Sequence, residues 1–256
     1  MTKVGVLGAA GRMGQAVCGA VYADPALELV ARVDPGVDGF ADSPHALVDA
    51  EASVAVDFTR PDAVMDNVRF CIEHGIHVVV GTTGLSDADL TEIEQLTSSS
   101  AANVLVAPNF SIGAILMMHF ANQAARYLGS CEIVELHHND KLDAPSGTAL
   151  RTARGVARVW EEHGRPPGGE AAEGEEETVT GARGAEVSEV RVHSLRLQGL
   201  VAHQEVVFGG VGQTLTIRHD SIDRSSFMPG VVMAVKAIAD LRGLTVGLER
   251  LLDLEG

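Results

Sequence analysis

The chain is poor in cysteine, and this scarcity excludes two classes of protein. Its 256 residues include three cysteines, Cys18, Cys71 and Cys131, which lie far apart and mostly beside apolar residues. The sequence contains no CxxC spacing and no cluster of cysteine with histidine. We therefore expect reduced thiols in the core of a cytosolic protein, rather than a disulfide framework or a zinc site.

Positive charge is also scarce. The chain has 19 lysine and arginine residues against 35 aspartate and glutamate residues, which gives a formal net charge of -16. An acidic surface repels phosphate backbones and anionic lipids, so neither nucleic acid nor a membrane is an expected partner. Anions can bind such a protein only in local pockets of positive potential.

Long hydrophobic runs are missing as well. The most apolar stretch, IGAILMMHFANQAA (112–125), is interrupted by His119 and Asn122. It is shorter than the roughly 18 apolar residues that a transmembrane helix needs. The first residues, MTKVGVLG, lead directly into a strand-like segment with no room for a signal peptide. The expected location is therefore the cytoplasm.

What remains is an ordinary globular composition, with 46% hydrophobic and 21% charged residues. The first half alternates short apolar runs with helical stretches. The predicted strands cover 3–7, 27–34, 54–58, 76–80 and 104–108, and the predicted helices cover 11–24, 61–75 and 86–100. Such alternation is typical of βαβ units, so we predict a Rossmann-like, doubly wound parallel sheet of the α/β class.

The pattern changes after Phe110. Helices are predicted at 111–128 and 146–163, around an apolar strand at 131–138, and residues 161–178 are Gly/Pro-rich and acidic, as in a solvated loop. Strand-like runs then follow without helices at 187–197, 200–210 and 213–221, before a final helix at 229–243. Alternating polarity in the last run indicates a mixed or antiparallel open sheet with one exposed or partner-facing side, in an α+β domain.

The segment GAAGRMG (8–14) lies between the first strand and its helix. Glycines here allow a tight turn, close approach to a pyrophosphate and close helix–sheet packing, and the helix N-terminus offers N–H groups to the diphosphate. Asp34 stands at the end of the second strand, 20 positions after Gly14, where a carboxylate can accept hydrogen bonds from ribose hydroxyls. The three features together predict dinucleotide binding.

Two further loops follow predicted strands, GTTG (81–84) and APNFS (107–111). The loops after the carboxyl ends of parallel strands line one crevice of a doubly wound sheet. We therefore expect both segments beside the Gly-rich loop.

ELHHNDKLDAPSGTA (135–149) is the segment richest in chemical groups. Its two histidines and Lys141 offer proton donors and positive charge in an acidic protein. Neighbouring strand residues point to opposite faces, so the two histidines need a bend between them or separate roles. The helix that opens at Ser146-Gly147-Thr148 offers N–H groups to a carboxylate. The segment lacks the further ligands that a zinc site requires.

The ordered motifs together resemble one family. The Gly-rich loop, GTTG, APNFS, ELHHNDKLDAPSGTA, GLVAHQEVVFG and LTIRHDSIDRSSF are similar to successive signatures of the 4-hydroxy-tetrahydrodipicolinate reductases, also called dihydrodipicolinate reductases. The resemblance spans roughly residues 3 to 230. It implies NAD(P)H-dependent reduction of the dehydrated form of 4-hydroxy-tetrahydrodipicolinate to tetrahydrodipicolinate, in diaminopimelate and lysine biosynthesis, with NADH, NADPH or both as cofactor and no metal.

The resemblance also implies an organisation. The final helix is expected to return to the nucleotide-binding domain, which gives a dinucleotide-binding domain of residues 1–110 and 222–256. Residues 111–221 form the expected substrate-binding and tetramerisation domain, whose sheet joins a homotetramer. The small-molecule substrate is a cyclic dicarboxylate.

Site residues follow from the matched motifs. His137 matches the family's proton donor and Lys141 a second one, while His138, Gly147 and Thr148 match substrate contacts. The matched cofactor residues are Gly8, Ala9, Ala10, Gly11, Arg12, Met13, Asp34, Gly81, Thr82, Thr83, Ala107, Pro108, Asn109 and Phe110. Two positions depart from the pattern: Ala10 and Arg12 stand where some members carry lysines, and Pro35 rather than arginine follows Asp34. The second departure predicts that NADH is used at least as well as NADPH.

Two other functions compete with this interpretation. A non-catalytic NAD(H) redox sensor would need the nucleotide-binding domain and an assembly sheet, but it has no use for the HHNDK–SGT segment. A semialdehyde dehydrogenase would need a nucleophilic cysteine in its crevice, and Cys131, at the start of a strand, is poorly placed for that role.

Overall fold

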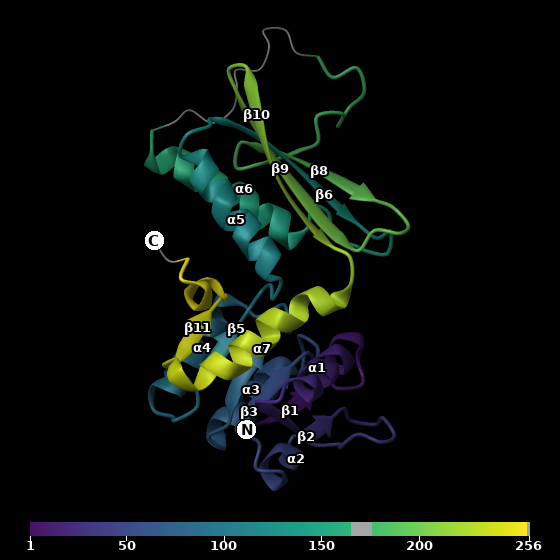
Figure 1. Cartoon of the computed structure of the whole chain (residues 1–256), viewed down its shortest axis with the longest axis vertical. Helices are drawn as coiled ribbons and strands as arrows, with labels where there is room; N and C mark the ends of the chain where they lie inside the picture. Colours follow the sequence, from purple (N-terminus) through teal and green to yellow (C-terminus); the bar gives the residue numbers. More distant parts are fainter. Residues whose placement is uncertain (165–175, 255–256) are drawn as a thin grey trace. The chain divides into compact units, whose positions relative to one another are not determined.

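The computed structural model describes residues 1–164 and 176–254, which form two compact units (Figure 1). Unit 1 consists of Met1–Ile112 and Arg224–Gly256, and unit 2 consists of Gly113–Asp223. The solvated loop expected at 161–178 falls largely on residues 165–175, outside the described residues.

Unit 1 is built on a six-stranded sheet in the order β11-β5-β4-β3-β1-β2. All neighbouring strands run parallel. The strands are β1 (Thr2–Leu7), β2 (Leu27–Val33), β3 (Val54–Asp57), β4 (His77–Val80), β5 (Val104–Val106) and β11 (Leu244–Val246). The strand order reverses direction beside β1, because β2 lies on one side of it and β3, β4 and β5 follow on the other. This confirms the doubly wound prediction and puts the ends of β1 and β3 at the switch point.

Helices cover both faces of this sheet. Leu47 of α2, Val64 and Val68 of α3 and Ile93 of α4 share one buried cluster with alternate strand residues. The opposite face carries α1 and α7, which pack against each other. The helices are α1 (Arg12–Ala23), α2 (His45–Asp49), α3 (Val64–Glu73), α4 (Asp87–Ser98) and α7 (Met228–Ala237), with short 3-10 turns η1 (Arg224–Phe227), η2 (Ile238–Asp240) and η3 (Glu249–Leu252).

Unit 2 is built on a five-stranded sheet in the order β10-β9-β6-β8-β7. The strands are β6 (Ser130–His137), β7 (Ala185–Val187), β8 (Val190–Arg196), β9 (Ala202–Gly210) and β10 (Gln213–Ser221), and α5 (Ile112–Ala125) and α6 (Gly147–Glu162) lie against one face (Figure 1). Of the two predicted alternatives, the mixed sheet is confirmed and the purely antiparallel sheet is wrong. The pair β6–β8 is parallel, since α6 lies between these strands in the chain, and the other pairs are antiparallel.

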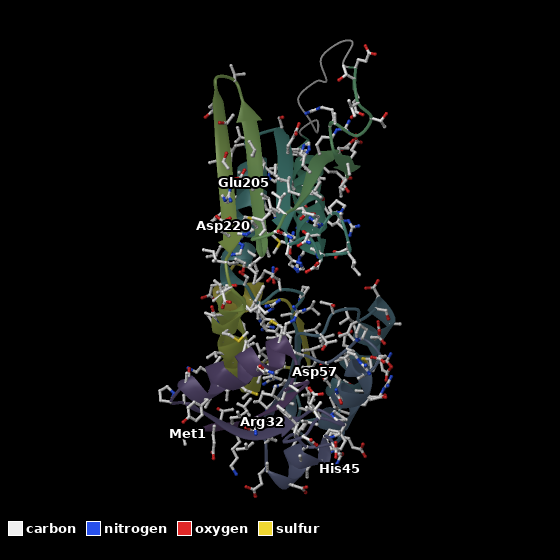
Figure 2. The ribbon with its side chains drawn as sticks, turned by 90° about the vertical axis from the view of Figure 1, so that its right-hand side faces the viewer. Met1, Arg32, His45, Asp57, Glu205 and Asp220 are labelled. Atoms are coloured by element: carbon white, nitrogen blue, oxygen red, sulfur yellow. The ribbon has the colours of Figure 1, made fainter. Side chains whose placement is uncertain are left out.

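The two faces of this sheet differ. The face toward α5 and α6 buries Cys131 and Ile133 of β6 and Val206 and Phe208 of β9. The opposite face carries ion pairs on the long hairpin β9–β10, where Arg218 contacts Glu205 and Asp220; the two carboxylates are labelled in Figure 2. This outer face is half-exposed, as the alternating polarity predicts.

Candidate functional site

The Gly-rich loop after β1 depends on two of its glycines. Gly8 has a φ of +74°, and a Cβ added there would collide with the carbonyl group of Phe58. A Cβ at Gly14 would collide with the carbonyl oxygen of Gly8. The loop therefore turns tightly beside the end of β3 and brings α1 close to β1. Gly11, the N-cap of α1, makes no side-chain capping bond, and the first turn carries no acidic residue.

Asp34 is joined to this loop. Its Oδ2 atom accepts a hydrogen bond from the backbone N–H of Ala10 at 2.8 Å. The contact holds the end of β2 against the Gly-rich loop. One carboxylate oxygen is thus engaged in organising the site, and the charge of Asp34 lies at the carboxyl edge of the sheet.

Asp57 organises the neighbouring loops and was missed by the sequence analysis. It ends β3, is fully buried, and accepts hydrogen bonds from Thr59, Asn67 and Thr82. The Thr82 hydroxyl, 2.6 Å from Asp57 Oδ1, holds the loop after β4. An acidic residue at the end of a buried strand, followed two residues later by threonine, is the local signal that could have revealed it.

The loops after β4 and β5 both approach the ring of Phe58, which follows β3. The rings of Phe58 and Phe110 have centroids 5.7 Å apart, and a Cβ at Gly81 would collide with the Phe58 ring. The carboxyl ends of β1, β3, β4 and β5 therefore form one organised edge. The predicted cofactor residues from these loops lie along it.

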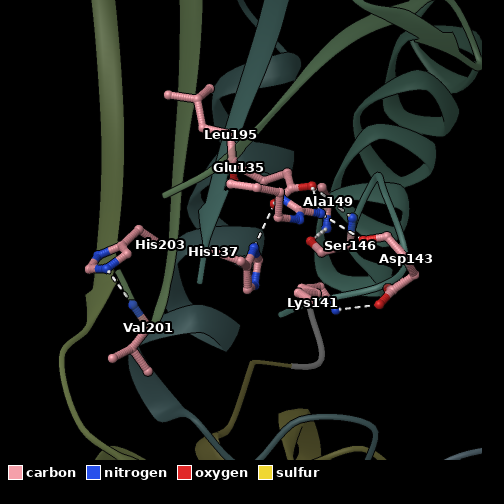
Figure 3. A network of polar contacts seen from close by, with 10 residues as sticks. Glu135, His137, Lys141, Asp143, Ser146, Ala149, Leu195, Val201 and His203 are labelled. Carbon is pink, nitrogen blue, oxygen red and sulfur yellow. Dashed lines mark hydrogen bonds and ion pairs between the residues drawn. The ribbon is translucent and has the colours of Figure 1, made fainter. Parts of the chain in front are cut away.

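In unit 2 the end of β6 carries a buried charge network (Figure 3). Nδ1 of His137 lies 2.5 Å from Oε2 of Glu135. Arg196 of β8 donates to both carboxylate oxygens of Glu135, at 2.9 and 2.8 Å. The backbone N–H of Ser146 donates to Oε1 at 3.2 Å. One carboxylate thus joins the end of β6, the end of β8 and the start of α6.

Glu135 is ionised in this network. Burial acts to raise its pKa, but hydrogen bonds from His137, Arg196 and Ser194 outweigh burial and lower the pKa to about 2. The side chain of Glu135 has no exposed area, whereas that of His137 is 14% exposed. An ionised, buried carboxylate therefore faces a partly accessible imidazole.

Lys141 lies on the loop between β6 and α6. Its ammonium group contacts Asp143 Oδ1 at 2.7 Å, and the side chain is 22% exposed. The hydrogen bond from Lys141 lowers the pKa of Asp143. Arg196 also donates to the carbonyl oxygen of Asp143 at 2.6 Å, so the loop is fixed at the same network that holds His137.

The helix α6 begins beside this network. Ser146 caps it by accepting the N–H of Ala149 at 3.2 Å, and Gly147 and Thr148 form the first turn. Strand β6 ends at His137, so His138 lies outside the strand, where it need not share the direction of His137. The substrate residues predicted from the sequence therefore come from one loop and the two element ends that flank it.

Other features of the chain bear on the competing functions. Cys131 is 6% exposed, and burial, together with the charge of Glu132, raises its thiol pKa to about 12. Such a thiol is a poor nucleophile at neutral pH. Within residues 1–164 and 176–254, no three His, Cys, Asp or Glu side chains gather as metal ligands. None of the helices in that part of the chain has the length and apolar character needed to cross a membrane.

Comparison with known proteins follows the division into two units. Residues 2–110 match the family model described as dihydrodipicolinate reductase, N-terminus, and residues 113–252 match dihydrodipicolinate reductase, C-terminus. The chain is 56% identical to the 4-hydroxy-tetrahydrodipicolinate reductase of Nocardia farcinica over 98% of this chain and 99% of that protein. It is also 56% identical to the Cutibacterium acnes protein of the same name, over the full length of both. A dipicolinate-bound dihydrodipicolinate reductase from Paenisporosarcina sp. TG-14 has a similar structure, with a TM-score of 0.88 and 38% identity over 98% of this chain and 99% of that one.

Proposed function

The chain belongs to the dihydrodipicolinate reductase family, and from this premise we propose that it reduces the dehydrated form of 4-hydroxy-tetrahydrodipicolinate with NADH or NADPH. The product is tetrahydrodipicolinate, which leads to diaminopimelate and lysine. The observation that supports the proposal is the contact of buried Glu135 with His137, near Lys141 and the start of α6 (Figure 3), because a proton donor beside groups that attract carboxylates would suit this reaction.

The residues of unit 1 fit a dinucleotide. Gly8 and Gly14 leave no room for side chains, so the loop backbone and the N-terminus of α1 can approach a diphosphate closely. Asp34 Oδ1 can accept from a ribose hydroxyl while Oδ2 keeps its bond to Ala10. The remaining contacts come from the loops Gly81–Thr83 and Ala107–Phe110. When bound, the reduced nicotinamide supplies a hydride.

Unit 2 supplies the groups that hold and protonate the substrate. Its substrate is a cyclic dicarboxylate, and Lys141 and the first turn of α6 provide positive potential for its two carboxylates. The ring gains the hydride at a carbon conjugated with an imine. The resulting enamine then takes a proton from the imidazolium of His137, so one hydride and one proton reduce one double bond.

We propose that the two domains have different functions. Residues 1–110 and 222–256 bind the cofactor, and residues 111–221 bind the substrate and form the contacts between subunits. The compact units end within two residues of these limits. Three free cysteines, two of them buried, fit the reducing conditions of the cytoplasm.

The half-exposed outer face of the unit 2 sheet supports assembly into a homotetramer. The apolar side chains of Val134 and Leu136 of β6 and Val207 of β9 lie on this face, together with ion pairs such as Arg218–Glu205. An isologous contact between such faces would cover them. Light scattering at micromolar concentration should give the mass of four chains, and a stable monomer would contradict the assembly.

The activity is tested by following NADH and NADPH oxidation with freshly generated substrate and identifying the product. We expect saturable, substrate-dependent oxidation that yields tetrahydrodipicolinate. Tight NADH binding without oxidation would instead favour a redox sensor. Oxidation of a semialdehyde by NAD⁺ would favour a dehydrogenase. Either result would overturn the proposal.

A further inference from the structure

The inner face of the unit 2 sheet changes from apolar to polar along the strands. Two rows of paired residues are apolar, and the next row, which crosses four strands, is polar. In the first two rows Cys131 pairs with Phe208, and Ile133 with Val206. The polar row consists of His219, Gln204, Glu135 and Ser194, from β10, β9, β6 and β8 in turn.

The middle of this polar row is buried, whereas Ser194 at one end is exposed and His219 at the other is partly exposed. Glu135 has no exposed area and Gln204 is 4% exposed. A hydrophobic residue at position 135 would continue the core that Ile133 begins. Burial of a carboxylate is unfavourable until its partners compensate it, so stability alone does not account for this choice. The row lies one step before His137, the last residue of β6.

The contacts of Glu135 determine the state of the His137 ring. An ionised carboxylate can only accept hydrogen bonds, so Nδ1 of His137 carries the hydrogen in the 2.5 Å contact. The proton that can leave the ring, or return to it, is therefore on Nε2. Arg196 fixes the carboxylate through both of its oxygens and leaves Glu135 little freedom to rotate.

We propose that Glu135 is the positioning residue of the reductase site, which orients the His137 ring and sets which of its nitrogens carries the proton to be transferred. The inference rests on the proposed function. Arg196 keeps Glu135 ionised. It also donates to the carbonyl oxygen of Asp143, which fixes the loop of Lys141 beside Glu135. Hydrogen-bonded partners that fix a catalytic ring act in this way in many sites.

The decisive variant is Glu135→Gln, which keeps the shape but removes the charge. We expect kcat at pH 7.5 to fall by ~10- to 100-fold, less than the loss of the acid itself, with the cofactor KM unchanged. The pH above which kcat declines should move down, because the variant removes the negative charge beside the ring. Glu135→Asp, which restores the charge, should recover much of the pH profile.

The matched control is Glu132→Gln, on the same strand and the opposite face. Glu132 contacts His193 and Arg183, each at 2.7 Å, so its replacement removes a similar ion-pair cluster. We expect this variant to keep the wild-type pH profile. An unshifted profile in Glu135→Gln, or an equal shift in Glu132→Gln, would overturn the positioning role.

A measurement without turnover separates this inference from the proposed function. Nitrogen NMR of the histidine rings reports which nitrogen of His137 carries the hydrogen. We expect Nδ1–H in the neutral ring of the wild type and a mixture of both forms in Glu135→Gln. If substrate is not reduced but this pattern holds, the function fails and the orienting contact stands. If the substrate is reduced but neutral His137 carries its hydrogen on Nε2, the positioning role fails. The wild-type spectrum decides this even if Glu135→Gln does not fold.

Discussion

Strand β6 carries a similar set of side chains on each of its two faces. On the inner face Glu135 contacts His137 and Arg196, and on the outer face Glu132 contacts His193 and Arg183. We call these the inner cluster and the outer cluster. Both join a carboxylate of β6 to a histidine and an arginine, so their residue types alone do not distinguish them.

The surroundings of the two clusters distinguish them. Glu135 is fully buried, whereas the side chain of Glu132 is 37% exposed. The inner carboxylate also accepts a backbone N–H at the start of α6, and its arginine reaches the loop that carries Lys141. Within a single chain, screening by water weakens the outer ion pairs, whereas the buried inner pairs keep their geometry. The comparison teaches that burial, a helix start and a neighbouring loop distinguish the inner cluster, which is the candidate site, from an ordinary ion-pair cluster.

The largest expected difference between the clusters is in catalysis. His137→Ala should lower kcat by ~10²- to 10⁴-fold, the usual contribution of general acid catalysis, with NADH binding nearly unchanged. His193→Ala removes the corresponding ring of the outer cluster and should leave kcat within about twofold of wild type, as expected for a residue that does not contact the substrate. Steady-state kinetics of the two variants decide this, and similar losses in both would break the comparison.

Lys141 lies on the loop that Arg196 joins to the inner cluster, and we propose that it holds a carboxylate of the substrate. A hydrogen bond to a charged group contributes ~1.5–3 kcal/mol, so Lys141→Ala should raise the substrate KM by ~10- to 100-fold and lower kcat as well. Lys3→Ala is the control, because Lys3 makes a similar 2.6 Å ion pair with Glu51 at the start of β1. The control should keep both constants. Unchanged kinetics in Lys141→Ala would remove Lys141 from the site.

Asp34 tests whether the same reasoning holds in unit 1, where another carboxylate accepts a backbone N–H at a strand end. A 2′-phosphate would bring about −1.5 to −2 charges toward it, by analogy with protein phosphates, and Pro35 adds no cation. NADH should therefore be used at least as well as NADPH. Asp34→Ala should reduce or reverse the preference for NADH, measured as kcat/KM with NADH divided by kcat/KM with NADPH, mostly through a lower KM for NADPH. Replacement of the exposed Asp38 by alanine should leave this ratio unchanged. A wild type that prefers NADPH more than tenfold would contradict this.

The smallest expected effect is on acid stability. The pKa of Glu135 is lowered from 4.5 to about 2, so its stabilising contribution is complete above pH 4.5 and is lost as the pH falls toward 2. Between pH 5 and 3 the wild-type Tm should fall more steeply than that of Glu135→Gln. Each ~1 kcal/mol of unfolding free energy that the wild type loses should lower its Tm by ~2–4 °C. Glu132→Gln should change this slope less, because Glu132 is more exposed. Calorimetry that gave both variants one slope would contradict the distinction.

The sequence predicted the elements whose signals are local. The parallel strands, the Gly-rich loop and Asp34 follow from patterns spanning a few tens of residues. The strand predicted at 131–138 ends one residue earlier, at His137, and the alternation of faces had left open whether a bend or separate roles distinguish the two histidines. Two of the three-residue strands, β7 and β11, and the five-residue helix α2 were missed, because three to five residues show no period. The helix predicted from Pro61 begins at Val64, after a turn in which Ala63 and Val64 donate to the Arg60 carbonyl.

The supporting residues of the site were harder to predict. Arg196 is 61 positions from Glu135, and only the parallel pairing of β6 and β8 brings them together. Glu135 itself belongs to the segment 135–149 that the sequence analysis singled out. The strand pattern puts Glu135 and His137 on the same face, but it does not reveal that Glu135 positions the His137 ring. Asp57 was hidden in the same way, since its donors Asn67 and Thr82 come from later elements. Local patterns therefore predict the groups that we propose to contact ligands more readily than the residues that position those groups.

The central claim is that the imidazole of the inner cluster delivers the proton, and chemical rescue tests it most directly. Free imidazole added to His137→Ala should restore turnover in proportion to the concentration of its protonated form, because a small acid can occupy the space left by the ring. The same addition should not accelerate His193→Ala or the wild type. Near-wild-type turnover of His137→Ala without imidazole, or equal stimulation of all three proteins, would contradict the account.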